Sequence, residues 1–161
     1  MRTALLVCLT LPLGGCGPLR SIGLLPSPPP PTDYLLAITL SATPDINPDA
    51  SGRASPLRLH VYAGERDPGF GDLGFDAVFG TGAASGTGPT PLDTLVVAPG
   101  QSVELALTPD TRAVWVTIAA AYREPWSAIW SESVRVDGSG TARVRVELER
   151  ATLRLLPGSD R

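Results

Sequence analysis

The sequence predicts an all-β fold, an antiparallel β-sandwich of two sheets with a short helical insert. Apolar residues make up 43% of the 161-residue chain, which is enough for a hydrophobic core. The 17 glycines and 17 prolines indicate many turns between short strands rather than long helices. Seven or so short strands with turn signals between them favour one sandwich domain over residues 34–156.

The first two strands are expected at residues 34–42 and 57–63, on either side of a loop, residues 43–56. The first strand is a short apolar run with β-branched members, as expected for a buried strand. The second alternates with a period of two, which predicts a half-buried strand. Its core-facing residues would be Leu57, Leu59 and Val61, and its water-facing residues Arg58, His60 and Tyr62.

A helical insert is expected next, at residues 69–80, because Phe70, Leu73 and Ala77 recur at helical spacing. The glycines within it weaken any helix, so the insert should be short. Residues 81–91 are small and flexible, which predicts a surface loop. Residues 93–109 then predict two strands around a turn at Pro99 and Gly100.

The last third of the chain predicts a central strand followed by a hairpin. Residues 113–124 are nearly all apolar, which predicts a strand that is covered on both faces. Residues 127–137 and 141–149 alternate on either side of a Gly-Ser-Gly turn and predict the hairpin. The alternation slips near Arg150, which suggests a bulge or a bend. Residues 157–161 are expected to form a frayed tail.

The N-terminus predicts a lipoprotein signal peptide over residues 1–15. A basic start precedes an apolar run that is too short to span a bilayer as a stable helix, and small residues follow it. The stretch "LGGC", which ends at Cys16, resembles the bacterial lipobox and implies cleavage before Cys16 and acylation of this residue. An ordinary secretory signal with a chance cysteine is the alternative.

Residues 16–33 would then form a lipidated, proline-rich tether. Four consecutive prolines, residues 28–31, favour an extended polyproline conformation that lifts the domain off the membrane. Gly17 stands where an aspartate would suggest retention in the inner membrane, so the outer membrane is favoured. With Cys8 removed and Cys16 acylated, no free thiol remains for catalysis or a disulfide.

Composition and motifs argue against nucleic-acid binding and catalysis. All 13 basic residues are arginines, and the net charge of −3 is spread along the chain without a basic stripe. His60 is the single histidine and is expected to be a plain surface residue. Neither a nucleophile elbow nor a nucleotide-binding glycine loop has the required spacing. We therefore expect a non-enzymatic protein without a cofactor.

Two tryptophans leave a rival hypothesis open. Trp126 and Trp130 fall on one face if their segment is a strand, and they could form a platform for a ligand. Core packing or the rim of the sandwich is the other interpretation of these side chains. The rival function is therefore a lipid-anchored β-sandwich that binds a small ligand or a glycan.

The long loop at residues 43–56 is the best candidate for partner docking. Asp45, Asn47 and Asp49 alternate like the first ligands of an EF-hand, but Ala50 and Pro56 stand where that loop needs glycine and glutamate. No metal is therefore expected. The prolines of the loop restrict its backbone, so little conformational entropy would be lost when it binds a partner.

Several segments occur in an order that resembles a known family. They are the lipobox and the stretches "NPDASGRASPLRLHVY", "FDAVF", "VVAPGQSVELAL" and "AAAYREPWSAIW". The family that they resemble is the TssJ family of outer-membrane lipoproteins of type VI secretion systems. The glycine-rich insert and the extra loop at residues 81–91 depart from the family pattern. The resemblance implies a transthyretin-like sandwich tethered to the inner leaflet of the outer membrane, with the domain facing the periplasm.

The resemblance also implies a partner. In this family the domain binds the periplasmic domain of the large inner-membrane subunit, TssM, and helps to assemble the trans-envelope complex. The loop between the first two strands is a main contact, which here is residues 43–56. The residues expected to contact the partner are Asn47, Asp49, Ser51, Gly52 and Arg53, and a turn satisfied by its own hydrogen bonds is the alternative interpretation of these five.

Overall fold

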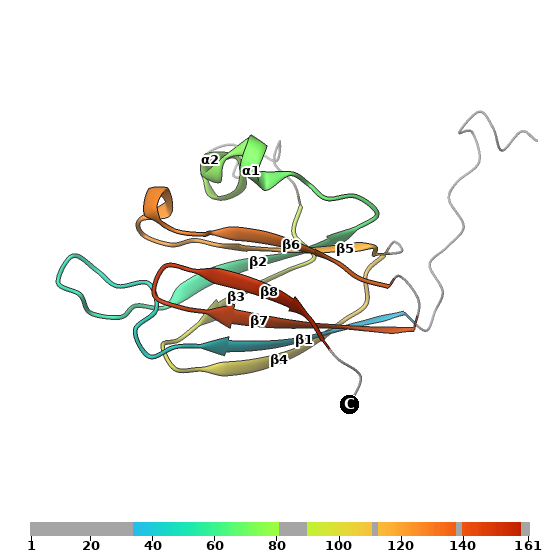
Figure 1. The fold of residues 1–161 in the computed structure, drawn as a ribbon, viewed down its shortest axis with the longest axis horizontal. Helices are drawn as coiled ribbons and strands as arrows, with labels where there is room; N and C mark the ends of the chain where they lie inside the picture. Colours follow the sequence, from blue (N-terminus) through green and yellow to red (C-terminus); the bar gives the residue numbers. More distant parts are fainter. Residues whose placement is uncertain (1–33, 81–89, 111–112, 138–139, 159–161) are drawn as a thin grey trace, which may run out of the picture.

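The computed structural model describes residues 34–80, 90–110, 113–137 and 140–158, which fold as two four-stranded sheets packed face to face (Figure 1). This confirms the predicted all-β sandwich with a short helical insert. The predicted signal peptide (1–15), the tether with Cys16 (16–33), most of the loop at 81–91 and the last three residues of the tail lie outside the described residues.

The first sheet has the strand order β4-β1-β7-β8 and the second β3-β2-β5-β6. The strands of the first sheet are β1 (Leu35–Ala42), β4 (Ser102–Leu107), β7 (Thr141–Leu148) and β8 (Leu153–Pro157). Those of the second sheet are β2 (Leu57–Gly64), β3 (Asp93–Val97), β5 (Trp115–Ala120) and β6 (Ser131–Arg135). All neighbouring strands are antiparallel except β1 and β7, which run parallel.

The prediction of a hairpin around the Gly-Ser-Gly turn is wrong. Strand β6 pairs with β5 in the second sheet, whereas β7 pairs with β1 and β8 in the first. The chain therefore crosses between the sheets there. Strands β3 and β4 are likewise divided between the two sheets on either side of Pro99 and Gly100. A turn signal shows that the chain reverses, but it carries no information about which sheet the next strand joins.

The actual hairpin joins β7 to β8. Its turn is closed by the Glu149 N–H, which donates to the Thr152 carbonyl at 2.8 Å, so the slip of the pattern near Arg150 marks a turn rather than a bulge. Strand β8 runs to Pro157, and the Gly158 N–H donates to the Arg143 carbonyl at 2.7 Å. The first two residues of the expected tail are thus still attached to the sheet.

The hydrophobic core lies between the inner faces of the two sheets. Apolar side chains that alternate along the strands fill it, and burial of this surface is the main favourable contribution to folding. The expected inward set of β2 is fully buried, and β5 is covered on both faces as predicted. Core side chains with at most 1% exposure include Leu36, Ile38, Leu40, Leu57, Leu59, Val61, Val116, Ile118 and Leu148.

The helical insert consists of α1 (Phe70–Leu73) and α2 (Phe75–Phe79), and it covers the outer face of the second sheet (Figure 1). The Phe70 ring lies 4.7 Å from the ring of Tyr62, and the Phe79 ring lies 4.6 Å from that of His60. The expectation that His60 and Tyr62 face water is therefore wrong, because the insert provides a second small core over them. Within the described residues no helix is long and apolar enough to cross a bilayer.

Candidate partner-binding site

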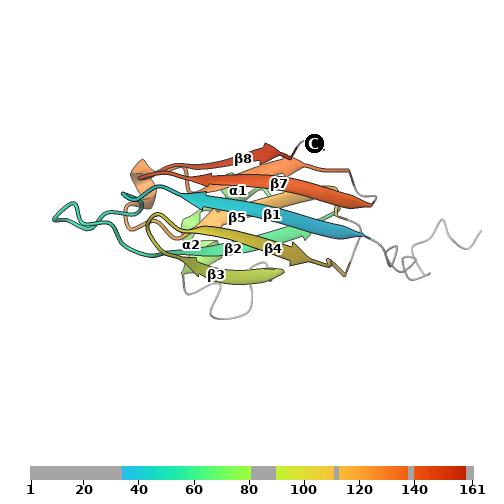
Figure 2. The same cartoon turned by 90° about the horizontal axis from the view of Figure 1, so that it is seen from below.

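The loop at residues 43–56 projects beyond the ends of β1 and β2 at one end of the sandwich (Figures 1 and 2). Two other connections lie at the same end. One is the segment between β5 and β6, which contains the short 3-10 helix η2 (Pro125–Ser127), and the other is the turn between β7 and β8. The loop is therefore supported by chain segments that lie far from it in the sequence.

Asn47 fixes the base of the loop and is only 4% exposed. Its backbone N–H donates to the Arg150 carbonyl at 3.0 Å, and its side-chain Nδ2 donates to the Pro56 carbonyl at 3.0 Å. Its Oδ1 accepts a hydrogen bond from the Arg123 N–H at 2.9 Å. The backbone of Asn47 has φ 46°, a conformation that asparagine tolerates better than most residues. This residue therefore joins the loop to both neighbouring connections.

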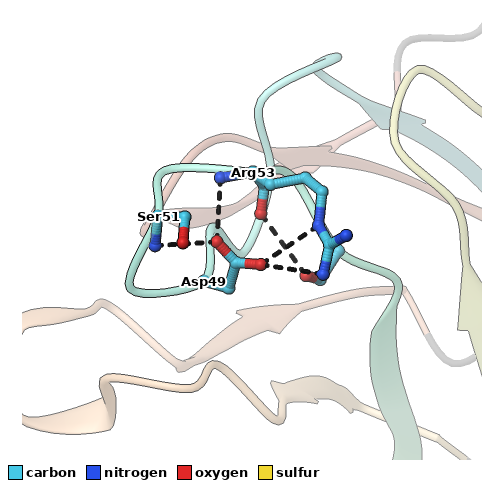
Figure 3. Close-up of polar contacts among 4 residues, drawn as sticks. Asp49, Ser51 and Arg53 are labelled. Carbon is cyan, nitrogen blue, oxygen red and sulfur yellow. Dashed lines mark hydrogen bonds and ion pairs between the residues drawn. The ribbon is translucent and has the colours of Figure 1, made fainter.

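The tip of the loop closes on the carboxylate of Asp49 (Figure 3). Oδ1 accepts hydrogen bonds from the backbone N–H groups of Ser51 at 2.9 Å and Arg53 at 3.0 Å. Oδ2 accepts one from Nε of Arg53 at 3.1 Å and forms an ion pair with its Nη2, also at 3.1 Å. Gly52 has φ 79°, a left-handed conformation that glycine adopts without strain.

These contacts hold the pKa of Asp49 below its usual range. The hydrogen bond from the Arg53 N–H is the largest cause, and the Ser51 N–H and the charge of Arg53 act in the same direction against partial desolvation. An ionised carboxylate accepts these bonds better than a neutral carboxyl group does. The tip is thus organised around an ionised Asp49 at neutral pH.

The structure separates the five residues predicted from the sequence into two groups. Ser51, Gly52 and Arg53 are exposed at the tip, and the side chain of Arg53 is 84% exposed. Asp49 belongs to the same closed turn, but its carboxylate is already occupied. Asn47 lies apart from them, buried at the base. The first three can touch another protein directly, whereas Asp49 and Asn47 hold them in place.

A cleft of about 280 Å³ lies beside the loop and was not predicted from the sequence. Its lining includes residues 48–50 from the loop, Glu124 and Ser127 from the segment between β5 and β6, and Arg150 from the turn between β7 and β8. The buried Tyr122 also lines the cleft, and its hydroxyl donates to the Glu149 carbonyl at 3.1 Å. The cleft arises because three connections converge in space, which local sequence patterns do not encode.

The described residues contain no group of three His, Cys, Asp or Glu side chains placed to hold a metal ion. His60, expected at the surface, is half-buried against Phe79 and its Nδ1 lies 3.1 Å from the Tyr62 hydroxyl. Desolvation, with a smaller contribution from the charge of Arg58, lowers the pKa of His60. Its surroundings are those of a packed histidine under the helical insert.

The two tryptophans do not form the shared platform that the rival hypothesis requires. Residues 125–127 form a 3-10 helix rather than a strand, and Trp126 on this helix is 85% exposed. Trp130 is half-buried, with its ring 5.3 Å from the ring of Phe75 in the helical insert. The Trp126 ring projects into solvent and the Trp130 ring packs under α2. The two rings therefore do not support the hypothesis of a ligand or glycan platform.

Comparison with known proteins identifies relatives of this chain. The family model for the type VI secretion lipoprotein family, described as VasD, EvfM and TssJ, matches residues 35–151. This match spans every strand from β1 to β7, together with the loop and the cleft. No curated protein matches the chain significantly.

Solved structures with the same fold come from type VI secretion systems. The crystal structure of the lipoprotein TssJ1 from Pseudomonas aeruginosa is 28% identical, with a TM-score of 0.68, covering 83% of this chain and 100% of that one. A chain in a structure of the TssM C-terminal domain from EAEC is 24% identical, with a TM-score of 0.61, covering 77% and 98%. A chain in a type VI membrane complex is 23% identical, with a TM-score of 0.63, covering 76% and 98%.

Proposed function

Since this chain belongs to the type VI secretion lipoprotein family that includes TssJ, we propose that it docks the periplasmic domain of the inner-membrane subunit TssM. In doing so it helps to assemble the trans-envelope complex of the secretion system. The role is structural and not enzymatic. The observation that carries the proposal is the exposed tip of the loop, residues 49–53, held in one conformation by its own hydrogen bonds.

Two of the similar structures agree with this partner. One is a structure of the TssM C-terminal domain and the other is a type VI membrane complex, and each contains a chain with the fold described above. A chain of this fold therefore occurs in structures of the partner and of the assembly.

The geometry of the loop suits a docking role. A tip that is ordered before binding loses little conformational entropy when a partner covers it. The exposed guanidinium of Arg53 can donate to a carboxylate or to carbonyl groups of the partner, and such charge-assisted hydrogen bonds are among the stronger ones. Ser51 and Gly52 lie beside it and allow a close approach. Asp49 and Asn47 act as positioning residues.

The lipid anchor sets where this docking takes place. We propose that Cys16 is acylated after cleavage and that its acyl chains insert into the inner leaflet of the outer membrane. Each buried CH₂ group contributes about 0.8 kcal/mol, so several chains together make a stable anchor. The tether at residues 16–33 would then hold the sandwich in the periplasm, within reach of a partner that extends from the inner membrane.

A site-specific crosslink tests the proposal with the lipoprotein as it exists in cells. A photo-crosslinking amino acid at position 51 is expected to form an adduct with TssM upon irradiation. The matched control carries the same group at Arg145, an exposed position on β7 in the first sheet. An adduct at position 51 and none at 145 supports the proposal. Absence of a TssM adduct at position 51, while TssM is present, would contradict it.

A further inference from the structure

Trp126 is the most exposed large apolar side chain among those the structure describes, at 85%. Tryptophan is usually well buried, because its ring carries a large apolar area with one polar N–H. Tryptophan is also enriched among the few interface residues that dominate binding energy. An indole held in water on a folded domain therefore suggests a surface that another protein covers.

The backbone that carries Trp126 is rigidly placed. Helix η2 starts with Pro125, and the Ser127 N–H and hydroxyl both donate to the Glu124 carbonyl, at 3.2 Å each. On one side of the helix, the Arg123 N–H donates to Asn47 Oδ1. On the other side, Ile129 bridges in parallel to Thr152. The indole is thus presented from a short segment that is fixed at both ends.

The segment that carries Trp126 lies next to the loop proposed to bind the partner. Its neighbours Glu124 and Ser127 line the same cleft as residues 48–50, and both views place η2 and the loop at one end of the sandwich (Figures 1 and 2). A protein that covers the loop tip would therefore extend naturally over η2.

The charges of the cleft indicate what the partner presents there. Arg123 and Arg150 line the cleft with exposed side chains, and neither forms an ion pair within the described part of the chain. Against them stands Glu124, while Asp49 is already paired with Arg53. With Arg53 counted, three arginines stand against the two carboxylates of Asp49 and Glu124, so the surface around the cleft carries one excess positive charge and favours a carboxylate of the partner.

We propose that Trp126 is the aromatic anchor of a docking surface that extends from the loop tip across the cleft to η2. The partner provides an apolar pocket for the indole and an acidic side chain for the cleft. This inference rests on the proposed function, because the protein that covers this docking surface is the periplasmic domain of TssM. The contact made by Trp126 is the one that sets the affinity of the complex.

Binding of the Trp126→Ala variant to the purified periplasmic domain of TssM tests the inference. The dissociation constant is expected to rise about thirtyfold or more, as for a central aromatic anchor. Leu73→Ala is the matched control, since Leu73 is a 53% exposed apolar residue on α1, which contributes no residue to the cleft, whereas η2 contributes Ser127. This control is expected to bind like the wild type, within about twofold.

Oxidation of the wild-type protein with N-bromosuccinimide gives an independent readout that requires no substitution. Mass analysis of the peptide that contains Trp126 would measure the oxidation of this side chain. The bound TssM domain is expected to protect Trp126 from oxidation. Unchanged affinity of Trp126→Ala, or unchanged oxidation of Trp126 in the complex, would overturn the inference and leave the proposed function intact. Failure of the wild type to bind the TssM domain at all would overturn both.

The charge of the cleft is tested separately with the variant Arg123→Ala/Arg150→Ala. The wild-type dissociation constant is expected to rise as salt is added, because salt screens the pairing of the cleft with the partner's carboxylate. The double variant should bind more weakly at low salt and respond less to added salt. An identical salt dependence for both proteins would overturn the acidic contact.

Discussion

The side chain of Asn47 accepts a hydrogen bond at 2.9 Å from the backbone N–H of Arg123, a residue 76 positions later in the chain. This one contact ties the loop at residues 43–56 to the segment that carries η2. It also explains why the loop is ordered at its base although its tip extends into solvent. The docking surface proposed above depends on this connection.

Replacing Asn47 with alanine is expected to destabilise the domain by about 1–3 kcal/mol. The change leaves the part-buried Arg123 N–H and Pro56 carbonyl without their hydrogen-bond partners, and the loss of such partners is costly. Urea unfolding monitored by circular dichroism measures this loss. Ser51→Ala is the control at the exposed tip, with an expected change within about 0.5 kcal/mol. Equal stability of the two variants would refute the positioning role of Asn47.

The tip of the loop is expected to lose its structure only at strongly acidic pH. The pKa of Asp49 is lower in the folded protein than in the unfolded chain, because backbone N–H groups of Arg53 and Ser51 donate to its carboxylate. Its contribution to stability is therefore present above the unfolded pKa of about 3.9 and is lost as the pH falls through the lower folded value.

Amide chemical shifts of Ser51 and Arg53 would report this titration by NMR. Their common midpoint is expected below about 3.9. In Asp49→Asn the same amides should show no titration in this range. A midpoint in the wild type at or above the usual aspartate value would show that the carboxylate does not hold the tip.

Acidification below neutral pH is expected to weaken the packing of the helical insert on the second sheet. Burial beneath Phe79 lowers the pKa of His60, so the unfolded chain binds a proton more readily than the folded one. The stabilising contribution of neutral His60 is present above its unfolded pKa of about 6.5. It decreases as the pH falls from there towards the lower folded value, below which the loss levels off.

Urea unfolding between about pH 5 and 7.5 would separate this contribution from the other titrating groups. The wild type should lose more stability towards pH 5 than His60→Gln, which carries no titrating ring. Parallel stability curves for the two proteins would rule out the desolvated His60 as the cause.

The proposed lipidation is tested with two single substitutions, at Cys16 and at Gly17, where the mature chain is proposed to begin. Cys16→Ser is expected to abolish labelling with radioactive palmitate and to remove the processed protein from the outer-membrane fraction, because the acylated thiol is lost. Gly17→Asp should keep the label but move the protein toward the inner membrane. Palmitate labelling that persists in Cys16→Ser would place the acyl chains elsewhere.

Much of the fold could be predicted from local patterns. The period-two alternation of β2 and β7 and the apolar run of β5 give the strands and their core faces, since burial on one or both faces requires such sequences. The pairing of strands is not local. The parallel contact between β1 and β7 joins residues about a hundred positions apart and leaves no signal in either strand.

For the same reason, only part of the candidate site could be predicted from the sequence. The loop could be predicted because its residues are polar and rich in proline, and the exposure of Arg53 within it could be predicted as well. The burial of Asn47 depends on the distant Arg123 N–H, and the exposure of Trp126 depends on η2 replacing a strand. Tyr62 was expected to face water because the insert that covers it comes later in the chain.

The most direct test of the docking role compares two exposed arginines, Arg53 at the loop tip and Arg145 on β7. The measurement is the dissociation constant between the lipoprotein domain and the TssM periplasmic domain, by isothermal titration calorimetry. Arg53→Ala is expected to raise it at least tenfold, or about 1.4 kcal/mol, with an unchanged melting temperature, since an exposed ion pair contributes little to stability. Arg145→Ala should bind like the wild type. Wild-type affinity in Arg53→Ala, or an equal loss in both variants, would contradict docking through the loop.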